Sequence, residues 1–274
     1  MQNSLIGFIG AGNMAHAIIS GLINNGTKRN QIKISDINEA LLSLRKAELN
    51  LEVFTDNAKL AAQCGVIVLA VKPQVLSSVC KALKDKLTTN TLLISIAAGV
   101  RSGDIERWLG DSQAIVRTMP NTPALLNQGI TGLFANEQVS DKQKSLAENI
   151  LNSVGECLWV DDESLLDAIT AVSGSGPAYF FLMLESMAKA GVALGLDEAV
   201  AQKLSLQTAL GASMMASNSK DSPQQLRNKV TSKNGTTQAA IASFQDQDFE
   251  VIIIHAIRAA FDRANEIGIE LGNE

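Results

Sequence analysis

Histidine, cysteine and aromatic residues are scarce in this chain of 274 residues. It has two histidines and three cysteines, and aromatic side chains make up 4% of its residues. Cys64, Cys80 and Cys157 are odd in number, far apart and without CxxC spacing, which argues against a disulfide framework or a structural zinc site. We therefore expect no metal site, and we expect reduced, buried thiols of the kind typical of a cytoplasmic protein.

The chain also lacks a basic excess, a signal peptide and a long apolar run. Lys and Arg number 23 against 28 Asp and Glu, a net charge of −5, which favours solubility and argues against nucleic acid or an anionic membrane as a partner. The opening residues MQNSLIGFIGAGNMA lack the basic start of a signal peptide. Apolar stretches such as GVIVLAV at 65–71 fall far below the length of a membrane span.

What the chain does have is aliphatic residues, in alternating strand and helix patterns up to about residue 161. Hydrophobic residues make up 46% of the chain, and continuous apolar runs such as Val66–Val71 are typical of strands buried on both faces. This alternation predicts βαβ units and a parallel sheet. The expected strands are Ser4–Ile9, Ile32–Ser35, Leu51–Phe54, Val66–Val71, Thr91–Ile96, Ala114–Met119, Gly132–Ala135 and Cys157–Val160, and the helices between them are Asn13–Asn25, Asn38–Ala47, Ala58–Cys64, Gln74–Leu87, Ser102–Leu109 and Lys142–Val154.

After Asp161 the pattern is helical only. We expect an α/β protein with two domains, a Rossmann-type parallel-sheet domain over residues 1–162 and an all-helical domain over 163–274. Two of the later helices are apolar nearly all round, and one small domain can hardly bury both, so we expect a second subunit to cover them. The expected helices are Ser164–Val172, Ala178–Leu194, Glu198–Ser217, Pro223–Val230, Thr236–Phe244 and Phe249–Ile267.

A dinucleotide fingerprint lies between the first strand and the first helix. Gly10-Ala11-Gly12-Asn13-Met14-Ala15 matches G-x-G-x-x-G/A in the context that makes the motif informative. Gly10 permits the tight turn, Gly12 lets the backbone approach a pyrophosphate, and Ala15 is small enough for close helix–strand packing. The helix N-terminus then offers free N–H groups to phosphate oxygens. The alternative is a glycine-rich turn without a ligand.

Further candidates for cofactor binding follow the carboxyl ends of later strands. Ser35 and Asp36 end the second strand, where an acidic residue accepts from the ribose 2′-OH of NAD and repels a 2′-phosphate. Asp36 therefore favours NADH, unless it is only a solvated cap of the next helix, whereas Ser35 can bond either group. Two more segments follow strands at this edge of the sheet. In the first of them, Lys72 can bind a ribose or a phosphate; the alternative is a plain surface lysine. These segments are Ala70-Val71-Lys72-Pro73 and Ser95-Ile96-Ala97-Ala98-Gly99, whose small residues leave room for a nicotinamide ring.

Several segments, taken in order, resemble pyrroline-5-carboxylate reductase, the last enzyme of proline synthesis. The resemblance covers essentially the whole chain, and the pair MPNTP and SGSGPAY is far more specific than the glycine fingerprint alone. The segments are GFIGAGNMA at 7–15, AVKP at 70–73, SIAAGV at 95–100, MPNTP at 119–123, SGSGPAY at 173–179 and VTSKNGTT at 230–237.

This resemblance implies reduction of 1-pyrroline-5-carboxylate to L-proline with NADPH or NADH. It also implies an N-terminal Rossmann domain and a C-terminal helical domain that intertwines with a second subunit, giving a homodimer or a ring of dimers. The family commonly prefers NADPH and often carries Ser or a similar uncharged residue where this chain has Asp36, so the two indications for the cofactor conflict.

The resemblance also implies individual site residues. It places Thr237 near the ring nitrogen of the substrate, where the hydroxyl orients the imine and relays a proton; the substrate brings its own electrophile, so no strong protein acid is needed. Asn57 would contact the cofactor, with an N-cap of the next helix as its alternative. Asn121 would lie near the nicotinamide or belong to a structural turn. The implied substrate-binding residues are Glu163, Ser232, Gly235, Thr236 and Thr237, with helix capping as the alternative for Glu163 and for the two threonines.

One departure from the family pattern falls in the substrate loop. The family usually has Ser-Pro-Gly-Gly-Thr-Thr, whereas this chain has Ser232-Lys233-Asn234-Gly235-Thr236-Thr237. Asn tolerates the left-handed backbone region better than most residues, so we expect the turn to survive. Lys233 either assists carboxylate binding or faces solvent, and we favour solvent.

Three competing interpretations can be separated by sequence features. A β-hydroxyacid dehydrogenase would need a lysine a few residues after Gly176, but the next lysine is Lys189. A non-catalytic protein that senses NAD(P) is supported only by the altered Lys233-Asn234 pair. A purely structural dimerisation protein leaves the glycine fingerprint unexplained.

Overall fold

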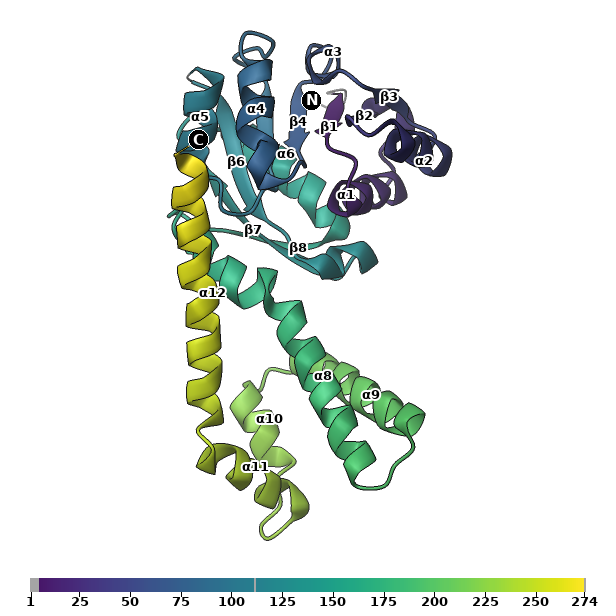
Figure 1. Cartoon of the computed structure of the whole chain (residues 1–274), viewed down its shortest axis with the longest axis vertical. Helices are drawn as coiled ribbons and strands as arrows, with labels where there is room; N and C mark the ends of the chain where they lie inside the picture. Colours follow the sequence, from purple (N-terminus) through teal and green to yellow (C-terminus); the bar gives the residue numbers. More distant parts are fainter. Residues whose placement is uncertain (1–4, 111, 274) are drawn as a thin grey trace. The chain divides into compact units, whose positions relative to one another are not determined.

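The computed structural model describes residues 5–110 and 112–273. Ser4, the expected start of the first strand, lies outside the described residues. So do residue 1, where the first expected domain begins, and residue 274, where the second one ends. The chain forms two compact units: unit 1 is Met1–Ser175 with Ala260–Glu274, and unit 2 is Gly176–Ala259 (Figure 1). Residues 163–175 belong to unit 1 because they pack on its sheet. The two compact units therefore divide the chain at other residues than the predicted domain boundary at 162/163. That boundary stays a prediction.

Unit 1 is built on one eight-stranded sheet in the order β3-β2-β1-β4-β5-β6-β7-β8. The first six strands run parallel and have the order of a dinucleotide-binding fold, in which ligands bind beyond the carboxyl ends of the strands where the order reverses, here at β1 and β4. The strands are β1 (Ile6–Ile9), β2 (Ile32–Ser35), β3 (Glu52–Phe54), β4 (Val66–Leu69), β5 (Leu92–Ser95), β6 (Ala114–Met119), β7 (Gly129–Ala135) and β8 (Gly155–Trp159).

The expectation of an all-parallel sheet is wrong for β7 and β8. Strand β7 pairs antiparallel with β6, with Thr118 opposite Leu133, and β8 then pairs parallel with β7. Only residues 120–128 join β6 to β7, and a parallel connection needs a crossover of about a dozen residues or more. The chain therefore reverses direction here and adds two strands to the far edge of the sheet.

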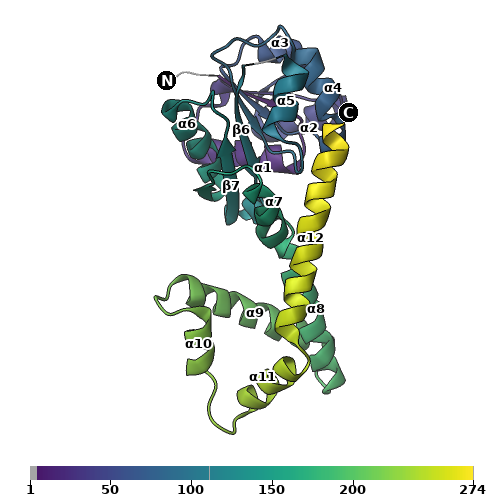
Figure 2. The same ribbon diagram turned by 90° about the vertical axis from the view of Figure 1, so that its left-hand side faces the viewer.

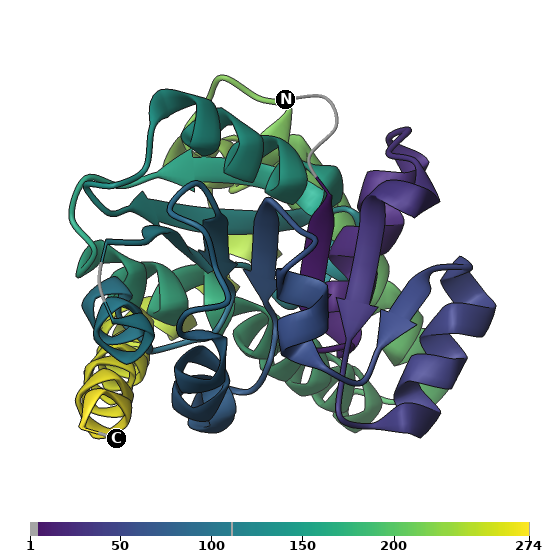
Figure 3. The same cartoon turned by 90° about the horizontal axis from the view of Figure 1, so that it is seen from above.

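Helices cover both faces of this sheet (Figure 3). A hydrophobic cluster on one face includes Ile18 of α1 and Ile150 of α6, and a cluster on the other face includes Leu76 of α4, Ile105 of α5 and Leu271 of α12. The helical elements of this unit are α1 (Asn13–Asn24), η1 (Arg29–Gln31), α2 (Glu39–Leu49), α3 (Asn57–Ala61), α4 (Pro73–Leu83), α5 (Ser102–Leu109), η2 (Thr122–Leu126), α6 (Asp141–Leu151), η3 (Asn152–Val154), α7 (Leu165–Ile169), the π-helical turn η4 (Thr170–Gly174) and the part of α12 (Phe249–Gly272) from Ala260 onward.

The predicted elements are confirmed, with differences at their ends. The side chain of Asn38 caps α2 by accepting from the N–H of Leu41, and Asn50 ends that helix in the left-handed conformation. Helix α4 ends at Leu83 rather than Leu87, and Asp85 takes a left-handed backbone just beyond it. The largest difference is at residues 173–177, which fall between two of the expected helices: a π-helical turn continues α7 almost directly into α8.

Unit 2 is helical throughout. Helices α8 and α9 pack closely, and Figure 2 shows α9, α10 and α11 following one another round the unit. Met183, Met187, Phe244 and Ile253 contribute to an apolar groove of about 1080 Å³ between α8, α10, α11 and the start of α12. The helices are α8 (Gly176–Ala193), α9 (Glu198–Ser217), α10 (Pro223–Lys229), α11 (Thr236–Asp246) and the first part of α12.

Many apolar side chains of unit 2 are exposed in the single chain. Phe180 and Phe181 are each 66% exposed and Ile252 is 56% exposed. A soluble chain rarely leaves so much apolar surface uncovered, so this surface indicates a second subunit. By length and composition alone, Leu165–Ala193 also qualifies as a membrane span, and the expectation that no stretch would qualify is wrong because this helix adds several short apolar runs together.

Candidate functional site

The fingerprint loop has the geometry expected of a phosphate-binding turn. Gly10 has φ +106°, and a Cβ there would lie 2.5 Å from the carbonyl oxygen of Ala70, so only glycine fits. At Gly12 a Cβ would meet no atom within 4 Å, which leaves open space over the start of α1. Gly12 is the N-cap of α1 and brings no side chain to the first-turn N–H groups of Asn13 and Met14. A dinucleotide pyrophosphate fits this open, donor-lined end.

Both peptide groups of Ala11 are held by charged side chains. The N–H of Ala11 donates to Asp36 Oδ2 at 2.8 Å, and Arg45 Nε donates to the carbonyl of Ala11 at 3.1 Å. Arg45 is buried and also pairs with Glu48 at 2.6 Å. The loop is thereby fixed before any ligand arrives. Sequence reasoning missed this role of Arg45, because no local pattern marks an arginine on α2 that folds back onto a loop 34 residues earlier.

Asp36 stands at the end of β2 with both carboxylate oxygens engaged. Oδ2 accepts from Ala11 and Oδ1 accepts from the N–H of Asn38 at 2.9 Å. The N-cap of α2 is Asn38 rather than Asp36, so the simple capping alternative for Asp36 is wrong. Its negative charge is held beside the phosphate loop, and Arg45, which bonds to the same residue Ala11, is already paired with Glu48.

Ser35 and Asn57 form a hydrogen-bonded pair behind Asp36. Ser35 is fully buried, and its hydroxyl donates to Asn57 Oδ1 at 2.7 Å. Asn57 is the first residue of α3, whose N-cap is Asp56, so the alternative of Asn57 as the N-cap is wrong. Ser35 orients Asn57 in this arrangement, and direct contact of either side chain with a cofactor stays a prediction.

The other predicted cofactor residues lie at the same edge of the sheet, after β4 and β5. Strand β4 ends at Leu69, so Ala70 and Val71 are in the loop, Lys72 is the N-cap of α4 and Pro73 is its first residue. After β5, Ala97 is buried and Ala98 is half-buried. The topology thus gathers these segments with the glycine loop and Asp36 beyond the carboxyl ends of β1, β2, β4 and β5.

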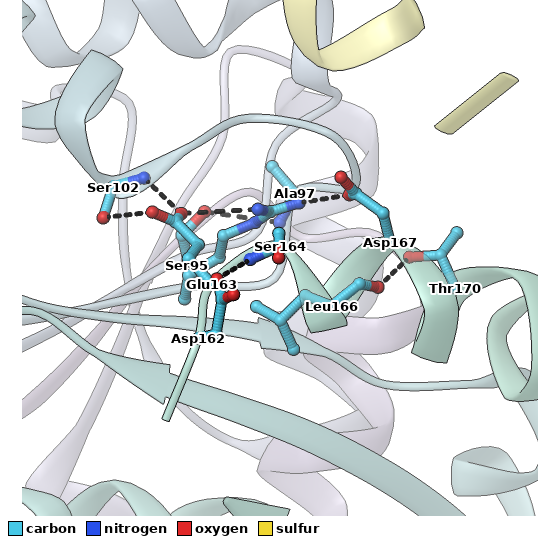
Figure 4. Close-up of polar contacts among 10 residues, drawn as sticks. Ser95, Ala97, Ser102, Asp162, Glu163, Ser164, Leu166, Asp167 and Thr170 are labelled. Atoms are coloured by element: carbon cyan, nitrogen blue, oxygen red, sulfur yellow. Dashed lines mark hydrogen bonds and ion pairs between the residues drawn. The ribbon is translucent and has the colours of Figure 1, made fainter. Parts of the chain in front are cut away.

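A buried charge cluster lies between β6 and α7 (Figure 4). Arg117, whose side chain is 3% exposed, lies 3.3 Å from Glu163 Oε1 and 3.2 Å from Asp167 Oδ1. Ser102 donates its backbone N–H and its hydroxyl to the two oxygens of Glu163, each at 2.7 Å. Sequence reasoning did not identify Arg117, although an arginine inside a strand predicted to be buried was the available signal, because such a charge needs a partner.

Asn121 of the MPNTP segment has a structural position. It is buried, its Nδ2 donates to the carbonyl of Ser173 in the π-helical turn at 3.2 Å, and its Oδ1 accepts from the N–H of Ile130 at 3.0 Å. Gly174 lies directly against Met119, where a Cβ would come within 2.4 Å of its methyl group. MPNTP therefore holds the π turn against the start of β7, which supports the structural alternative.

The predicted substrate loop lies in unit 2, before α11. Asn234 has φ +60°, so the expected left-handed turn is confirmed, and its N–H donates to Gln238 Oε1 at 2.5 Å. The N-cap of α11 is Gly235, without a side-chain cap, so neither Thr236 nor Thr237 has the N-cap role. Lys233 is exposed, as we favoured.

The histidines and cysteines are not among the predicted site residues. His16 lies 3.5 Å from Glu48, and its pKa is lowered by partial burial and by Arg45. His255 is exposed in the single chain, like most of residues 250–259 in the first part of α12. Cys64 and Cys80 are buried and Cys157 is half-buried. Burial raises the pKa of Cys64 to about 11 and that of Cys80 and Cys157 to about 12. Across residues 5–110 and 112–273, no group of three or more His, Cys, Asp or Glu could hold a metal.

Comparisons with known proteins cover both units. Residues 163–267 match the family model for pyrroline-5-carboxylate reductase dimerisation, and residues 5–99 match that for NADP oxidoreductase, coenzyme F420-dependent. The pyrroline-5-carboxylate reductase of Pseudomonas aeruginosa is 48% identical over 99% of this chain and 100% of its own length. That of Haemophilus influenzae is 44% identical over 97% and 98%.

Solved structures agree with these relatives. A pyrroline-5-carboxylate reductase from Coxiella burnetii superposes with a TM-score of 0.92 at 44% identity, covering 97% of this chain and 98% of that one. The Plasmodium falciparum enzyme with NADP bound superposes with a TM-score of 0.87 at 33% identity, covering 98% and 99%. The glycine loop has room for a dinucleotide, the second unit is helical, and the full-length relatives share this level of identity. The chain therefore belongs to the pyrroline-5-carboxylate reductase family.

Proposed function

We propose that this chain catalyses the reduction of 1-pyrroline-5-carboxylate to L-proline with NADPH or NADH. The observation that carries the proposal is the glycine loop: backbone atoms of Ala70 lie against Gly10, whereas the space beside Gly12 is free for a ligand. The chain's full-length relatives are pyrroline-5-carboxylate reductases. Family membership sets aside the β-hydroxyacid dehydrogenase. The altered Lys233-Asn234 pair keeps its left-handed turn, which removes the main support for a non-catalytic sensor.

The residues of unit 1 fit a nicotinamide dinucleotide. Gly12, Asn13 and Met14 would hold the pyrophosphate with the backbone N–H groups at the N-terminal end of α1. Gly10 and Ala11, whose own N–H groups are bonded to Ser35 and Asp36, would contact the cofactor by shaping the turn. The adenosine ribose would lie by Ser35, Asp36 and Asn57, and the ring would lie by Ala97 and Ala98, with Ala70, Val71, Lys72 and Pro73 between. When bound, the dinucleotide supplies the hydride, whereas the protein supplies orientation and a site with little water.

Substrate binding is assigned to Ser232, Gly235, Thr236 and Thr237 of unit 2. Since Gly235 leaves the first turn of α11 without a side-chain cap, its N–H groups suit the substrate carboxylate. The Thr237 hydroxyl orients the ring nitrogen and relays its proton. A protonated imine is already electrophilic, so this work needs no strong acid. Lys233 adds a positive charge near an anionic substrate without being required to touch it.

Thr237→Ala is expected to lower kcat by about 100-fold while the Kd for NADH changes less than twofold, because the hydroxyl acts at the ring nitrogen and not on the cofactor. Steady-state kinetics and calorimetric titration of NADH measure the two quantities. Thr231→Ala is a matched control, since the hydroxyl of Thr231 donates to the carbonyl of Arg227 at 2.6 Å within its own turn. An unchanged kcat in Thr237→Ala would contradict the role of Thr237.

We further propose that Asp36 makes NADH the better cofactor. A 2′-phosphate would meet a carboxylate fixed by two backbone N–H groups, and Arg45, which bonds to the neighbouring Ala11, is paired with Glu48. We expect kcat/KM for NADH to exceed that for NADPH by about tenfold, and Asp36→Ser to reverse or abolish this ratio. The absorbance of the reduced cofactor is followed with pyrroline-5-carboxylate present, using Asp56→Ser as the control for an acidic N-cap. A wild-type preference for NADPH would refute the assignment, and no oxidation of either cofactor would refute the reductase itself.

The helical region 163–267 matches the family's dimerisation model, so the protein forms a homo-oligomer. We propose the finer statements that the dimer uses the C-terminal helices, that dimers can assemble into a ring, and that the protein works in the cytoplasm without nucleic-acid or membrane partners. The exposed apolar faces of α8 and α12 support the first of these.

A further inference from the structure

Arg45 places a positive charge under the glycine loop. Its side chain is 8% exposed, its Nε donates to the carbonyl of Ala11 at 3.1 Å, and one of its terminal nitrogens pairs with Glu48 at 2.6 Å. An ion pair that is partly removed from water adds little net stability, because the lost hydration offsets much of the attraction between the charges. Stability alone therefore gives little reason for an arginine at this place.

The bond from Arg45 fixes the direction of the next N–H group in the loop. The carbonyl of Ala11 and the N–H of Gly12 belong to one planar peptide unit, and in a trans unit these two groups point in opposite directions. Since the carbonyl is turned toward Arg45 of α2, the N–H of Gly12 points away from that side chain. Asp36 holds the other side of Ala11 by accepting its N–H at 2.8 Å.

The N–H of Gly12 is the first one in the loop that can bind a ligand. The N–H groups of Gly10 and Ala11 are already bonded to Ser35 and Asp36. Within the part of the chain that the structure describes, no acceptor is bonded to the N–H of Gly12. A Cβ at Gly12 would also meet no atom within 4 Å, so there is open space beside this residue.

Glu48 holds Arg45 from the side of α2. Its carboxylate is 39% exposed, and it also lies 3.5 Å from Nε2 of His16. This carboxylate balances the charge of the guanidinium, which favours a directed hydrogen bond to Ala11 over a general attraction for phosphate.

We infer that Arg45 is a positioning residue for the pyrophosphate of the cofactor. It turns the Ala11–Gly12 peptide unit so that the N–H of Gly12 faces a phosphate oxygen, and Glu48 keeps the guanidinium in the orientation that this requires. Without the bond, the peptide unit can rotate, because Gly12 has no Cβ to restrict it. The inference rests on the proposed function, which identifies the ligand as a nicotinamide dinucleotide.

The test compares ligands with and without a pyrophosphate in Arg45→Met. Methionine keeps an apolar stem but has no donor for Ala11, and the half-exposed carboxylate of Glu48 can turn to water, so the variant is expected to fold. The Kd of NADH and of ADP-ribose, measured by calorimetry, is expected to rise about tenfold. The Kd of adenosine, measured by ligand-observed NMR, is expected to change less than twofold, because adenosine has no phosphate.

Steady-state kinetics give a second measurement on Arg45→Met. The KM for NADH is expected to rise about tenfold, whereas kcat at saturating NADH changes less than twofold, because the pyrophosphate is bound away from the atoms that exchange the hydride. The matched control is Arg29→Met. Arg29 also donates from Nε to a backbone carbonyl at 3.1 Å, but to that of Leu49 at the C-terminal end of α2, and its removal is expected to change each Kd less than twofold.

Variants of Glu48 test the inference even if Arg45→Met does not fold. Glu48→Ala frees the guanidinium and is expected to raise the Kd of NADH and ADP-ribose about threefold, although it removes a negative charge. Glu48→Gln keeps an oxygen acceptor for Arg45 and is expected to recover most of this loss. Tighter binding of NADH or NADPH in Glu48→Ala would overturn the inference, because Arg45 would then attract phosphate by its charge.

Two results with Arg45→Met would also overturn it. Unchanged binding of NADH and ADP-ribose would show that the loop does not need the bond, and an equal loss of adenosine binding would show a general effect on the site. The binding measurements need no turnover. If the wild-type protein binds NADH but does not oxidise it with pyrroline-5-carboxylate, the proposed function fails, while the binding results still decide the role of Arg45.

Discussion

Gly12→Thr is expected to weaken dinucleotide binding strongly while the ligand-free protein keeps its fold. A Cβ at Gly12 meets no atom within 4 Å, so the new side chain enters the space through which the pyrophosphate approaches and does not collide with protein. Threonine is also about as good an N-cap as glycine, so α1 itself is not weakened. Its hydroxyl then accepts the first-turn N–H groups that the phosphate would use. We expect the Kd of NADH and of ADP-ribose to rise by about 100-fold, roughly 2.7 kcal/mol.

The comparison with Gly10→Ala shows why the two glycines differ. At Gly10 a single methyl group would lie 2.5 Å from the carbonyl oxygen of Ala70, at a φ of +106°. This variant is expected to lose stability as well as binding, because backbone on both sides must move. Gly103→Ala is the neutral control, since a Cβ there also meets open space. Thermal unfolding and calorimetry separate the three variants, and a Gly12→Thr protein that binds NADH normally would refute the assignment of the loop.

Arg117→Met is expected to cost about 3–5 kcal/mol of unfolding free energy, a large share of the roughly 5–15 kcal/mol of a typical domain. Its guanidinium, 3% exposed, stands between the carboxylates of Glu163 and Asp167, and methionine leaves both of them without their cation. The cost arises from these uncompensated buried charges more than from the lost attraction. Urea unfolding of wild type and variant measures the difference.

The matched control for Arg117 is Arg263→Met. Arg263 also contacts two carboxylates, Glu266 and Glu270, both at 2.9 Å, but its side chain is 54% exposed. Water screens such a pair, so the loss is expected to stay below about 1 kcal/mol. Removing the stranded charges by adding Glu163→Gln and Asp167→Asn to Arg117→Met is expected to restore part of the stability. A loss below about 1 kcal/mol in Arg117→Met would show that the cluster is not electrostatically important.

Local signals in the sequence account for most elements. Apolar runs such as Val66–Leu69 could be assigned to strands because burial on both faces excludes polar residues, and Asn234 could be expected in a left-handed turn because its side chain tolerates positive φ. The direction of β7 could not be derived in the same way. It depends on which strand lies beside β6, and a strand pattern is the same for parallel and antiparallel pairing.

The same distinction applies to the candidate site. The residues of the glycine fingerprint could be assigned from the sequence, because the tight turn, the approach to the phosphate and the helix–strand contact all lie within six positions. Arg45 was missed because it bonds to Ala11 across 34 positions, and the cluster of Arg117, Glu163 and Ser102 spans 61. Glu163 is expected as a substrate ligand by resemblance, and its bonds to Ser102 and Arg117 could be found only in the folded chain.

By itself the sequence determined the α/β class, the dinucleotide loop, the helical second half with its need for a partner, and, through its motifs, the family. These depend on the order of residues over short stretches, where sterics and hydrophobic periodicity act directly. Only the tertiary structure decided three features: the reversed direction of β7 and β8 relative to β6, the bonds of Asp36 and Arg45 to Ala11, and the position of the Glu163 carboxylate at the start of α5. Those features arise from contacts between segments far apart in the chain, and the choice of partner for a buried charge is made when the chain folds.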